Sequence, residues 1–196
     1  MSLIPIEHGQ ILIATKPSGK NKSCCTMDTD EIILSSPIEE KIDWAEHCYE
    51  SFSGPLIKDK PIVDYLTWLE DAIQASHKEM GEAGILDICR DCEKNEGGSC
   101  CGAGLENKYD GWLLLINLLL DVRLPKKRHD KESCFFLGEG GCLLKARHVI
   151  CVNYLCKKIT DQIAPHKLNT LREKEGIELD ILFLLNERLK IYFKRL

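Results

Sequence analysis

Apolar residues recur at helical spacing along most of the chain. After Pro61 they follow the pattern of a helix with one buried face, at Ile62, Tyr65, Leu66, Leu69, Ala72 and Ile73. Glycines at 81 and 84 predict the end of this helix. An earlier helix is predicted from Ser36–Pro37 to about Phe52, because serine followed by proline is a common helix start and Gly54–Pro55 interrupts the pattern.

The second half of the chain predicts further helices. The segment 109–122 is almost entirely apolar and is typical of a buried helix. A helix is expected at about 146–163, ended by Pro165, and the tail 167–196 is expected to be helical with a break at Gly176. The apolar side of this tail is expected to pack in the core, with a partner surface as the alternative.

Two glycine-rich stretches, 85–104 and 132–145, are predicted to be mostly loop. Near the N-terminus, 11–14 and 31–34 are candidate strands on either side of a polar, turn-rich stretch. They form a short β-hairpin or belong to a mobile arm, and the pattern leaves both interpretations open. Residues 1–36 are therefore expected to be an arm or hairpin outside the main domain.

A length of 196 residues fits one domain with an arm. We expect a small, mostly α domain at 37–196, in which two irregular Cys/Gly-rich loops within 86–156 surround a metal centre. The 26 Lys and Arg against 31 Asp and Glu give a net charge of −5, which argues against nucleic acid as a partner. The basic connector 123–131 is accordingly expected to be a solvated loop, with a phosphate or acidic-partner contact as the alternative.

The start of the chain and its apolar runs indicate the cellular compartment in which we expect the protein. The start shows no basic leader followed by an apolar run, and the longest apolar run, 112–120, is shorter than the about 20 residues that span a bilayer. We therefore expect a cytoplasmic protein with reduced cysteines and no membrane partner. The sequence leaves open whether a partner is a protein or a small molecule, and which oligomeric state the chain adopts.

The chemistry of the chain is concentrated in its cysteines. Eight of the 11 fall in two groups, which are Cys89, Cys92, Cys100 and Cys101, then Cys134, Cys142, Cys151 and Cys156. Thiolates are soft ligands that select zinc or iron–sulfur over magnesium or calcium. Nearby glycines let the backbone bring N–H groups close to sulfur. His129 and His148 are the nearest histidines; each is expected at the surface or in a hydrogen bond, with ligation as the alternative.

The adjacent pair Cys100–Cys101 carries further information. In an extended segment the two side chains point to opposite sides. We expect one to ligate and the other to face a second site, a substrate or the core. Eight cysteines make two four-sulfur sites, or one site with four spare thiols. Outside the two groups, Cys48 is expected to be a buried core residue, and Cys24–Cys25 an exposed pair or a redox-active or ligating one.

These residues resemble a known family. Cys89-Arg90-Asp91-Cys92, followed by Gly98-Ser99-Cys100-Cys101-Gly102, is similar to the start of the YkgJ-like CxxCxxCC family of zinc- or iron-chelating proteins. Cys134-Phe135-Phe136-Leu137, Gly141-Cys142 and Arg147 followed by Cys151 resemble its second half. The first spacer is longer than usual, His148 stands where the family has proline, and Cys156 adds an eighth thiol.

The resemblance implies a metal centre of zinc or iron–sulfur. Distant relatives, the flagellin lysine methylases, are implied to use a [4Fe–4S] cluster, but no S-adenosylmethionine motif is recognisable here. We therefore expect a cysteine-ligated metal-binding protein with an iron–sulfur cluster, [4Fe–4S] favoured, in electron transfer or cluster-assisted chemistry. The alternatives are a structural zinc protein, and a methyltransferase-like or redox enzyme. The enzyme would need a pocket lined by the first helices and touching Cys100 or Cys101.

Overall fold

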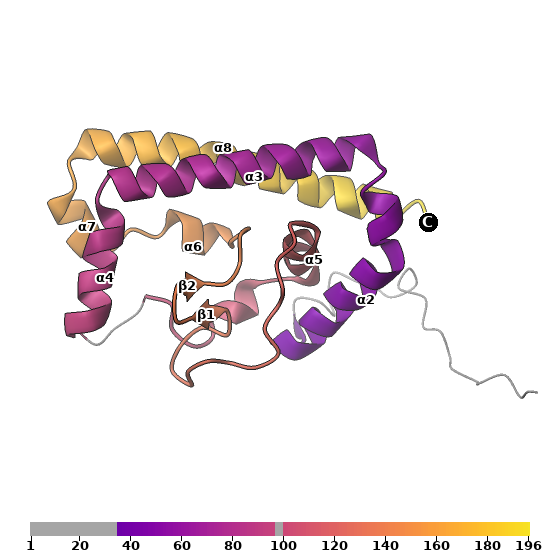
Figure 1. Ribbon diagram of the computed structural model, residues 1–196, viewed down its shortest axis with the longest axis horizontal. Helices are drawn as coiled ribbons and strands as arrows, with labels where there is room; N and C mark the ends of the chain where they lie inside the picture. The colour runs from indigo at the N-terminus through magenta and orange to yellow at the C-terminus, as the bar shows by residue number, and fades with distance from the viewer. Residues whose placement is uncertain (1–34, 97–99) are drawn as a thin grey trace, which may run out of the picture.

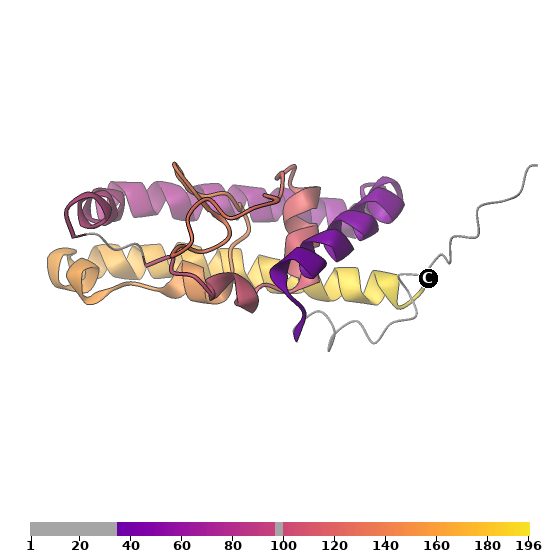
Figure 2. The same cartoon turned by 90° about the horizontal axis from the view of Figure 1, so that it is seen from below.

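Two long helices, α3 and α8, lie side by side and run in opposite directions along the whole molecule (Figures 1 and 2). The computed structural model describes residues 35–96 and 100–196. Its helices and strands in chain order are α2 (Ile38–Leu56), α3 (Lys60–Glu82), α4 (Ile85–Glu96), the 3-10 helix η1 (Leu105–Lys108), α5 (Gly111–Leu119), β1 (Leu137–Gly138), β2 (Gly141–Cys142), α6 (Val149–Asn153), α7 (Lys157–Gln162) and α8 (Pro165–Phe193).

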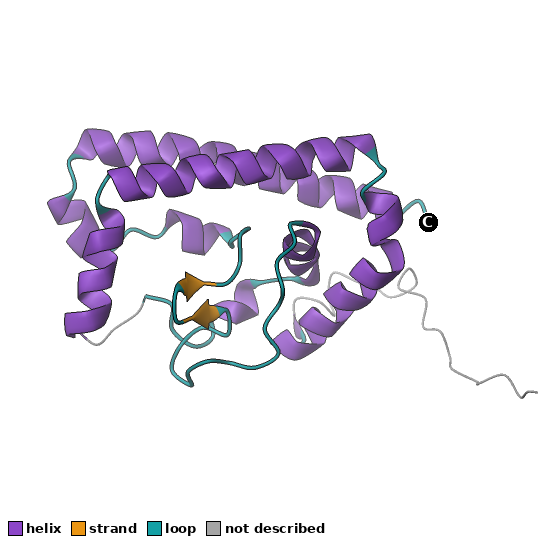
Figure 3. Ribbon diagram, in the orientation of Figure 1, coloured by secondary structure: helices purple, strands orange, loops and turns teal. Residues whose placement is uncertain are grey.

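The mostly α fold is confirmed. In the described part of the chain, β structure consists of the antiparallel β1–β2 pair and one isolated bridge (Figure 3). The candidate strands at 11–14 and 31–34 lie outside the described residues. Within the described ranges, no helix combines the length and apolar character needed to cross a bilayer.

The α3–α8 pair is held by an apolar seam and by polar contacts at its ends. Ile62 and Leu69 of α3 and Leu185 of α8 are fully buried in the main core. At one end, Arg188 pairs with Asp59 at 2.8 Å, and Asp59 also caps α3. This packing explains why α8 runs through Gly176, where a break was predicted: tertiary contacts outweigh the roughly 1 kcal/mol that a helical glycine costs.

Helix α5 fills the space between α2 and the long pair. It confirms the buried helix predicted at 109–122, and its first side chain, Trp112, packs edge-on against Trp44 of α2 at a centroid distance of 4.9 Å. A Cβ at Gly111 would collide with the Trp44 indole, so glycine is required for this approach. Cys48 of α2 is fully buried nearby, as expected.

The prediction that 85–104 is mostly loop is wrong for its first half. Helix α4 spans Ile85–Glu96 and carries Cys89 and Cys92. Gly84, with φ +88°, turns the chain out of α3, and Ile85 and Ile88 then pack in a second core against α7. Ile85, Ile88, Cys89 and Cys92 stand at i, i+3, i+4 and i+7, so the helical signal was present but was hidden by the cysteines.

The single helix predicted at 146–163 is two helices. Helix α6 ends at Asn153, the backbone is extended at Tyr154 and Cys156, and α7 begins at Lys157. His148 fixes the start of α6, because its Nδ1 accepts a hydrogen bond from Ile150 N at 3.2 Å. The interruption separates Cys151, on α6, from Cys156, which precedes α7.

Smaller differences concern helix ends and the tail. Helix α2 continues to Leu56 with Pro55 inside its last turn, beyond the predicted end near Phe52. The stretch 132–145 is loop, as predicted, apart from the β1–β2 hairpin. Along α8 the apolar residues divide: Leu182, Leu185 and Leu189 are buried, whereas Ile177, Phe183 and Leu184 are exposed.

Two carboxyl groups are buried at the α3–α8 seam. Glu175 and Glu178 are 2% and 0% exposed, and burial raises the pKa of both carboxyls. Ser76 donates a hydrogen bond to Oε2 of Glu178, while Oε1 has no hydrogen-bond partner. Because folding raises the pKa, the folded state holds the Glu178 proton more tightly than the unfolded chain does. Its contribution to stability is therefore greatest at low pH, and it falls as pH rises from about 4.3 through the raised value.

We predict that Glu178→Gln gains stability relative to the wild type as pH rises from 4 to 8. The amide cannot ionise, so it avoids a buried charge whose cost is on the order of 1 to 4 kcal/mol. Urea unfolding at the two pH values measures the difference. Glu173→Gln, at an exposed position of the same helix, is the control and should show no such gain. A Glu178→Gln variant whose free energy of unfolding, relative to the wild type, is lower at pH 8 than at pH 4 would contradict the raised pKa of Glu178.

Candidate metal centre

Five cysteines from three separate segments line one cavity of about 360 Å³, which we call the thiol cavity. They are Cys100, Cys101, Cys134, Cys142 and Cys151. Tyr109, Phe136 and Ile150 form much of the remaining wall. The cavity touches both Cys100 and Cys101, but none of its described lining residues comes from α2 or α3, the first helices of the fold.

Backbone pairing joins the two cysteine groups. Cys134 N donates to Cys101 O at 2.6 Å, and Gly102 and Ser133 form an antiparallel bridge. Ala103 N continues the contact by donating to the carbonyl of Glu132 at 2.9 Å. Two loops far apart in the sequence thus run side by side, and this brings Cys101 and Cys134 to the same cavity.

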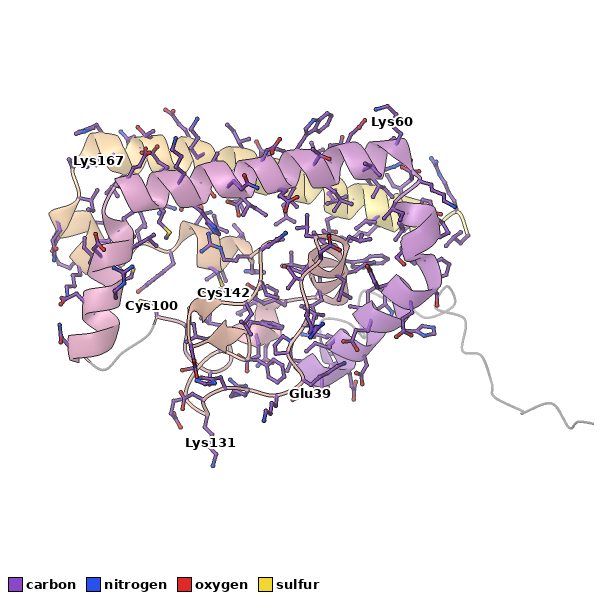
Figure 4. The ribbon with its side chains drawn as sticks, viewed as in Figure 1. Glu39, Lys60, Cys100, Lys131, Cys142 and Lys167 are labelled. Atoms are coloured by element: carbon purple, nitrogen blue, oxygen red, sulfur yellow. The ribbon has the colours of Figure 1, made fainter. Side chains whose placement is uncertain are left out.

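The β1–β2 hairpin positions Cys142. Leu137 and Cys142 are paired in register, and Leu143 N donates to Phe136 O at 2.9 Å. Gly141 adopts φ +113°, a conformation that favours glycine, at the start of β2. Figure 4 shows Cys142 at this hairpin and Cys100 between the hairpin and α4.

Tyr109 connects Cys151 to the core. It is 1% exposed, its hydroxyl accepts a hydrogen bond from His148 N at 3.1 Å, and it donates to Cys151 Sγ at 3.7 Å. Burial raises the pKa of the phenol well above its usual value, so the hydroxyl remains a neutral donor at physiological pH. A donor aimed at sulfur stabilises thiolate and tunes any metal bound to it.

A buried carboxylate braces the same loops from behind. Glu106 accepts hydrogen bonds from Gly104 N at 2.9 Å and Phe135 N at 3.4 Å, and it forms an ion pair with Arg128. Burial by itself raises the pKa of Glu106, but Arg128 and the backbone N–H donors outweigh it and hold the pKa below its usual range. Arg128 also donates to the carbonyl of Ser133, so a single pair ties together both cysteine-bearing segments.

The thiols of Cys134 and Cys142 are neutral at physiological pH in the absence of a metal. Burial raises the pKa of Cys134 to about 11 and also raises that of Cys142. The nearby positive charge of Arg147 opposes the shift at Cys142. Metal ligation would therefore release protons from these thiols as thiolates form.

Arg147 is the positive charge in the cavity wall. Its Nε is buried without a hydrogen-bond partner, and its charge opposes the rise in pKa that burial causes at the Glu175 and Glu178 carboxyls. A cation between two acids and a set of thiols offsets the negative charge that thiolates would bring. Arg147 is also the residue that resembles the arginine of the family motif.

The remaining cysteines of the two groups lie on the α4 and α7 side of the cavity. Cys89 and Cys92 are on α4, and Cys156 lies at the start of α7, which contacts α4. Burial raises the pKa of the Cys89 thiol, and so do the nearby thiols of Cys100 and Cys156. Five of the eight predicted ligands thus line the thiol cavity, and the other three lie on α4 or at the start of α7.

The eight predicted ligands are not arranged as closely as the ligands of a formed metal site. Among residues 35–96 and 100–196, no three or more His, Cys, Asp or Glu side chains are arranged to hold one metal ion. No disulfide joins any two of the described cysteines. The donor chemistry and the shared cavity nevertheless fit a thiolate-bound metal, since soft metals take sulfur ligands.

The other candidates are placed as follows. His148 caps α6 and borders a different cavity, and burial lowers its pKa. His129 is exposed. The basic connector is less free than expected, because Lys126 pairs with Glu46 and Arg128 with Glu106. The Cys24–Cys25 pair lies outside the described residues.

The sequence interpretation missed three supporting residues. Glu106 and Tyr109 lie between the two groups and carry no motif. Asn117 did carry a signal, because it is the one polar residue within the apolar run 112–120. It is fully buried and exchanges hydrogen bonds with both backbone groups of Ala146, at 2.9 and 3.1 Å, which fixes the segment leading to Arg147.

We predict that Glu106→Gln lowers the free energy of unfolding at pH 7 by about 2–4 kcal/mol. The amide loses the ion pair and turns donor hydrogens toward backbone N–H groups. Folding lowers the pKa of this carboxyl, so its contribution is present above the unfolded value and is lost as pH falls through the folded value. Urea unfolding at pH 7 and pH 4 should therefore show the deficit shrinking at the lower pH.

Glu132→Gln provides the matched control, because Glu132 is exposed in the partner loop and contributes its backbone carbonyl, which the substitution retains. Equal effects of the two substitutions, or a Glu106→Gln deficit that grows on acidification, would show that the carboxylate does not brace these loops.

Comparisons with known proteins do not identify a relative of this chain. No family model matches it, and neither the curated proteins nor the solved structures contain a significant match. The resemblance to the YkgJ-like family therefore remains a prediction that rests on the order of the cysteines, glycines and Arg147. What the site does must be inferred from the chemistry of its own residues.

Proposed function

We propose that the protein binds an iron–sulfur cluster, of the [4Fe–4S] type, in the thiol cavity through Cys101, Cys134, Cys142 and Cys151. The observation that carries this proposal is the convergence of thiols from three separate segments on one cavity of about 360 Å³. Four cysteine thiolates are the usual ligand set of such a cluster. The motif resemblance supports the same group of metals.

The size of the cavity favours a cluster over a single zinc ion. Zinc–sulfur bonds of about 2.3 Å would bring four tetrahedral sulfurs to about 3.8 Å from one another, so that the zinc ion alone would fill the space between them. A cluster places inorganic sulfide and several irons between the cysteine sulfurs and so uses an internal volume. A structural zinc site, in which the metal crosslinks the two loops, is the alternative.

The residues around the cavity have separate roles in this proposal. Tyr109 donates a hydrogen bond to Cys151, and Arg147 offsets negative charge beside Cys142. The fully buried Phe136 forms an apolar part of the cavity wall, which limits the access of water. Hydrogen bonds, charge and solvent exposure are the means by which a protein sets a cluster's potential. When bound, the cluster would supply one-electron transfer or an iron for cluster-assisted chemistry.

The proposed setting is the cytoplasm, where thiols remain reduced and available to metal. Buried thiols with a raised pKa, as at Cys134, would be held as thiolates by the metal itself rather than by an adjacent base.

We predict that protein purified without oxygen contains iron and acid-labile sulfide in equal amounts, about four of each for one cluster, and absorbs near 400 nm. Cys142→Ser and Cys151→Ser should each lose the iron of the cavity centre and most of the absorbance that belongs to it. The measurements are iron, zinc and sulfide analysis per chain together with the absorption spectrum.

Cys48→Ala is the control, because Cys48 is buried in the main core and does not line the thiol cavity. It should retain the iron, sulfide and spectrum of the wild type. Zinc without sulfide in the wild type would establish the structural alternative, and a wild-type protein without bound metal would rule out both forms of the proposal.

A further inference from the structure

We propose that Cys89, Cys92, Cys100 and Cys156 form a second thiolate centre for a soft metal, separate from the cavity centre. We call these four the outer set, and Cys101, Cys134, Cys142 and Cys151 the cavity set. The inference builds on the proposed function, since it assumes that the protein uses its thiols as metal ligands. It divides the eight cysteines into two complete four-sulfur sets.

Helix α4 supplies two neighbouring ligands of the outer set. Cys89 and Cys92 are three residues apart on this helix, so their side chains lie on one face. Cys89 is exposed and Cys92 is partly buried, so the pair lies at the edge of the helix packing and is accessible to a metal.

Packing between α4 and α7 adds the third ligand. Ile85 of α4 and Ile159 of α7 are buried in the second core, and Cys156 packs against that core together with Ile88. Beside this contact, Lys158 pairs with Asp91 at 3.3 Å, which fixes α7 next to the cysteine-bearing part of α4. Cys156 is therefore brought beside the Cys89–Cys92 pair by elements that do not contribute to the cavity set.

Three members of the cavity set pack in or against the main core. Cys134 is a buried member of the main core, and Cys101 and Cys151 pack against it. Backbone pairing with Cys134 fixes the orientation of Cys101. Cys100, which precedes Cys101, lies between the hairpin and α4, the helix that carries two members of the outer set (Figure 4). Cys100 is exposed at the edge of the cavity, on the boundary between the two sets.

The test uses the full chain purified without oxygen, with iron, zinc and sulfide measured per chain. One variant from each set carries the comparison, Cys89→Ser and Cys142→Ser, and a double variant combines them. Each single variant should lose the metal of one centre and keep that of the other, and the double variant should lose both. The adjacent pair sharpens the test: Cys100→Ser should match Cys89→Ser, whereas Cys101→Ser should match Cys142→Ser.

The metal that is lost identifies the outer centre. Loss of iron with sulfide from Cys89→Ser would assign a second cluster, and loss of zinc alone would assign a zinc ion. Cys89 is exposed, so its replacement by serine removes little packing, and unchanged helical circular dichroism would exclude misfolding as the cause. Cys156→Ser provides a second variant of the same set.

Three results would overturn the inference, and each contradicts a different part of it. A Cys89→Ser variant that keeps all of the wild-type metal would make the outer thiols spare, while the cavity centre would stand. Loss of all metal from either single variant would indicate one shared site. A wild-type protein without metal would remove the proposed function itself.

Discussion

The short backbone contact between 101–103 and 132–134 is the constraint on which the candidate centre depends. It has only a few hydrogen bonds, among them Cys134 N to Cys101 O at 2.6 Å, yet it brings together two loops that the sequence separates by an entire helix, α5. Glu106 stabilises the contact from its buried side by binding Arg128 and backbone N–H groups of both segments. This contact brings Cys101 of the first group beside Cys134 of the second.

The rest of the fold supports the same arrangement. The α3–α8 pair provides a rigid surface, and α5, held by Asn117 to the backbone of Ala146, fixes the segment that leads to Arg147. Desolvation in the thiol cavity raises the pKa of Cys134 and Cys142, so these two thiols are neutral until a metal displaces their protons. A metal bound in the thiol cavity would crosslink the loops that carry its cysteines, which the apolar core positions only at their ends.

The sequence was sufficient to predict the helical class and the buried helix around 112–120, and it named eight candidate ligands, of which five line one cavity. It was insufficient for α4, because Cys89 and Cys92 were interpreted as loop ligands although they continue the i, i+3, i+4, i+7 pattern of Ile85 and Ile88. It also missed the interruption before Cys156, where the backbone is extended between α6 and α7. Which cysteines share a neighbourhood depends on long-range packing, and spacing along the chain does not encode that.

Anomalous X-ray scattering from crystals of protein grown without oxygen would test the central claim most directly. Data collected on both sides of the iron and zinc absorption edges would locate each metal and name it. The account predicts an iron signal in the thiol cavity, bounded by Cys101, Cys134, Cys142 and Cys151, and a second metal signal among Cys89, Cys92, Cys100 and Cys156. A cavity without any metal signal, in crystals whose protein binds metal elsewhere, would contradict it.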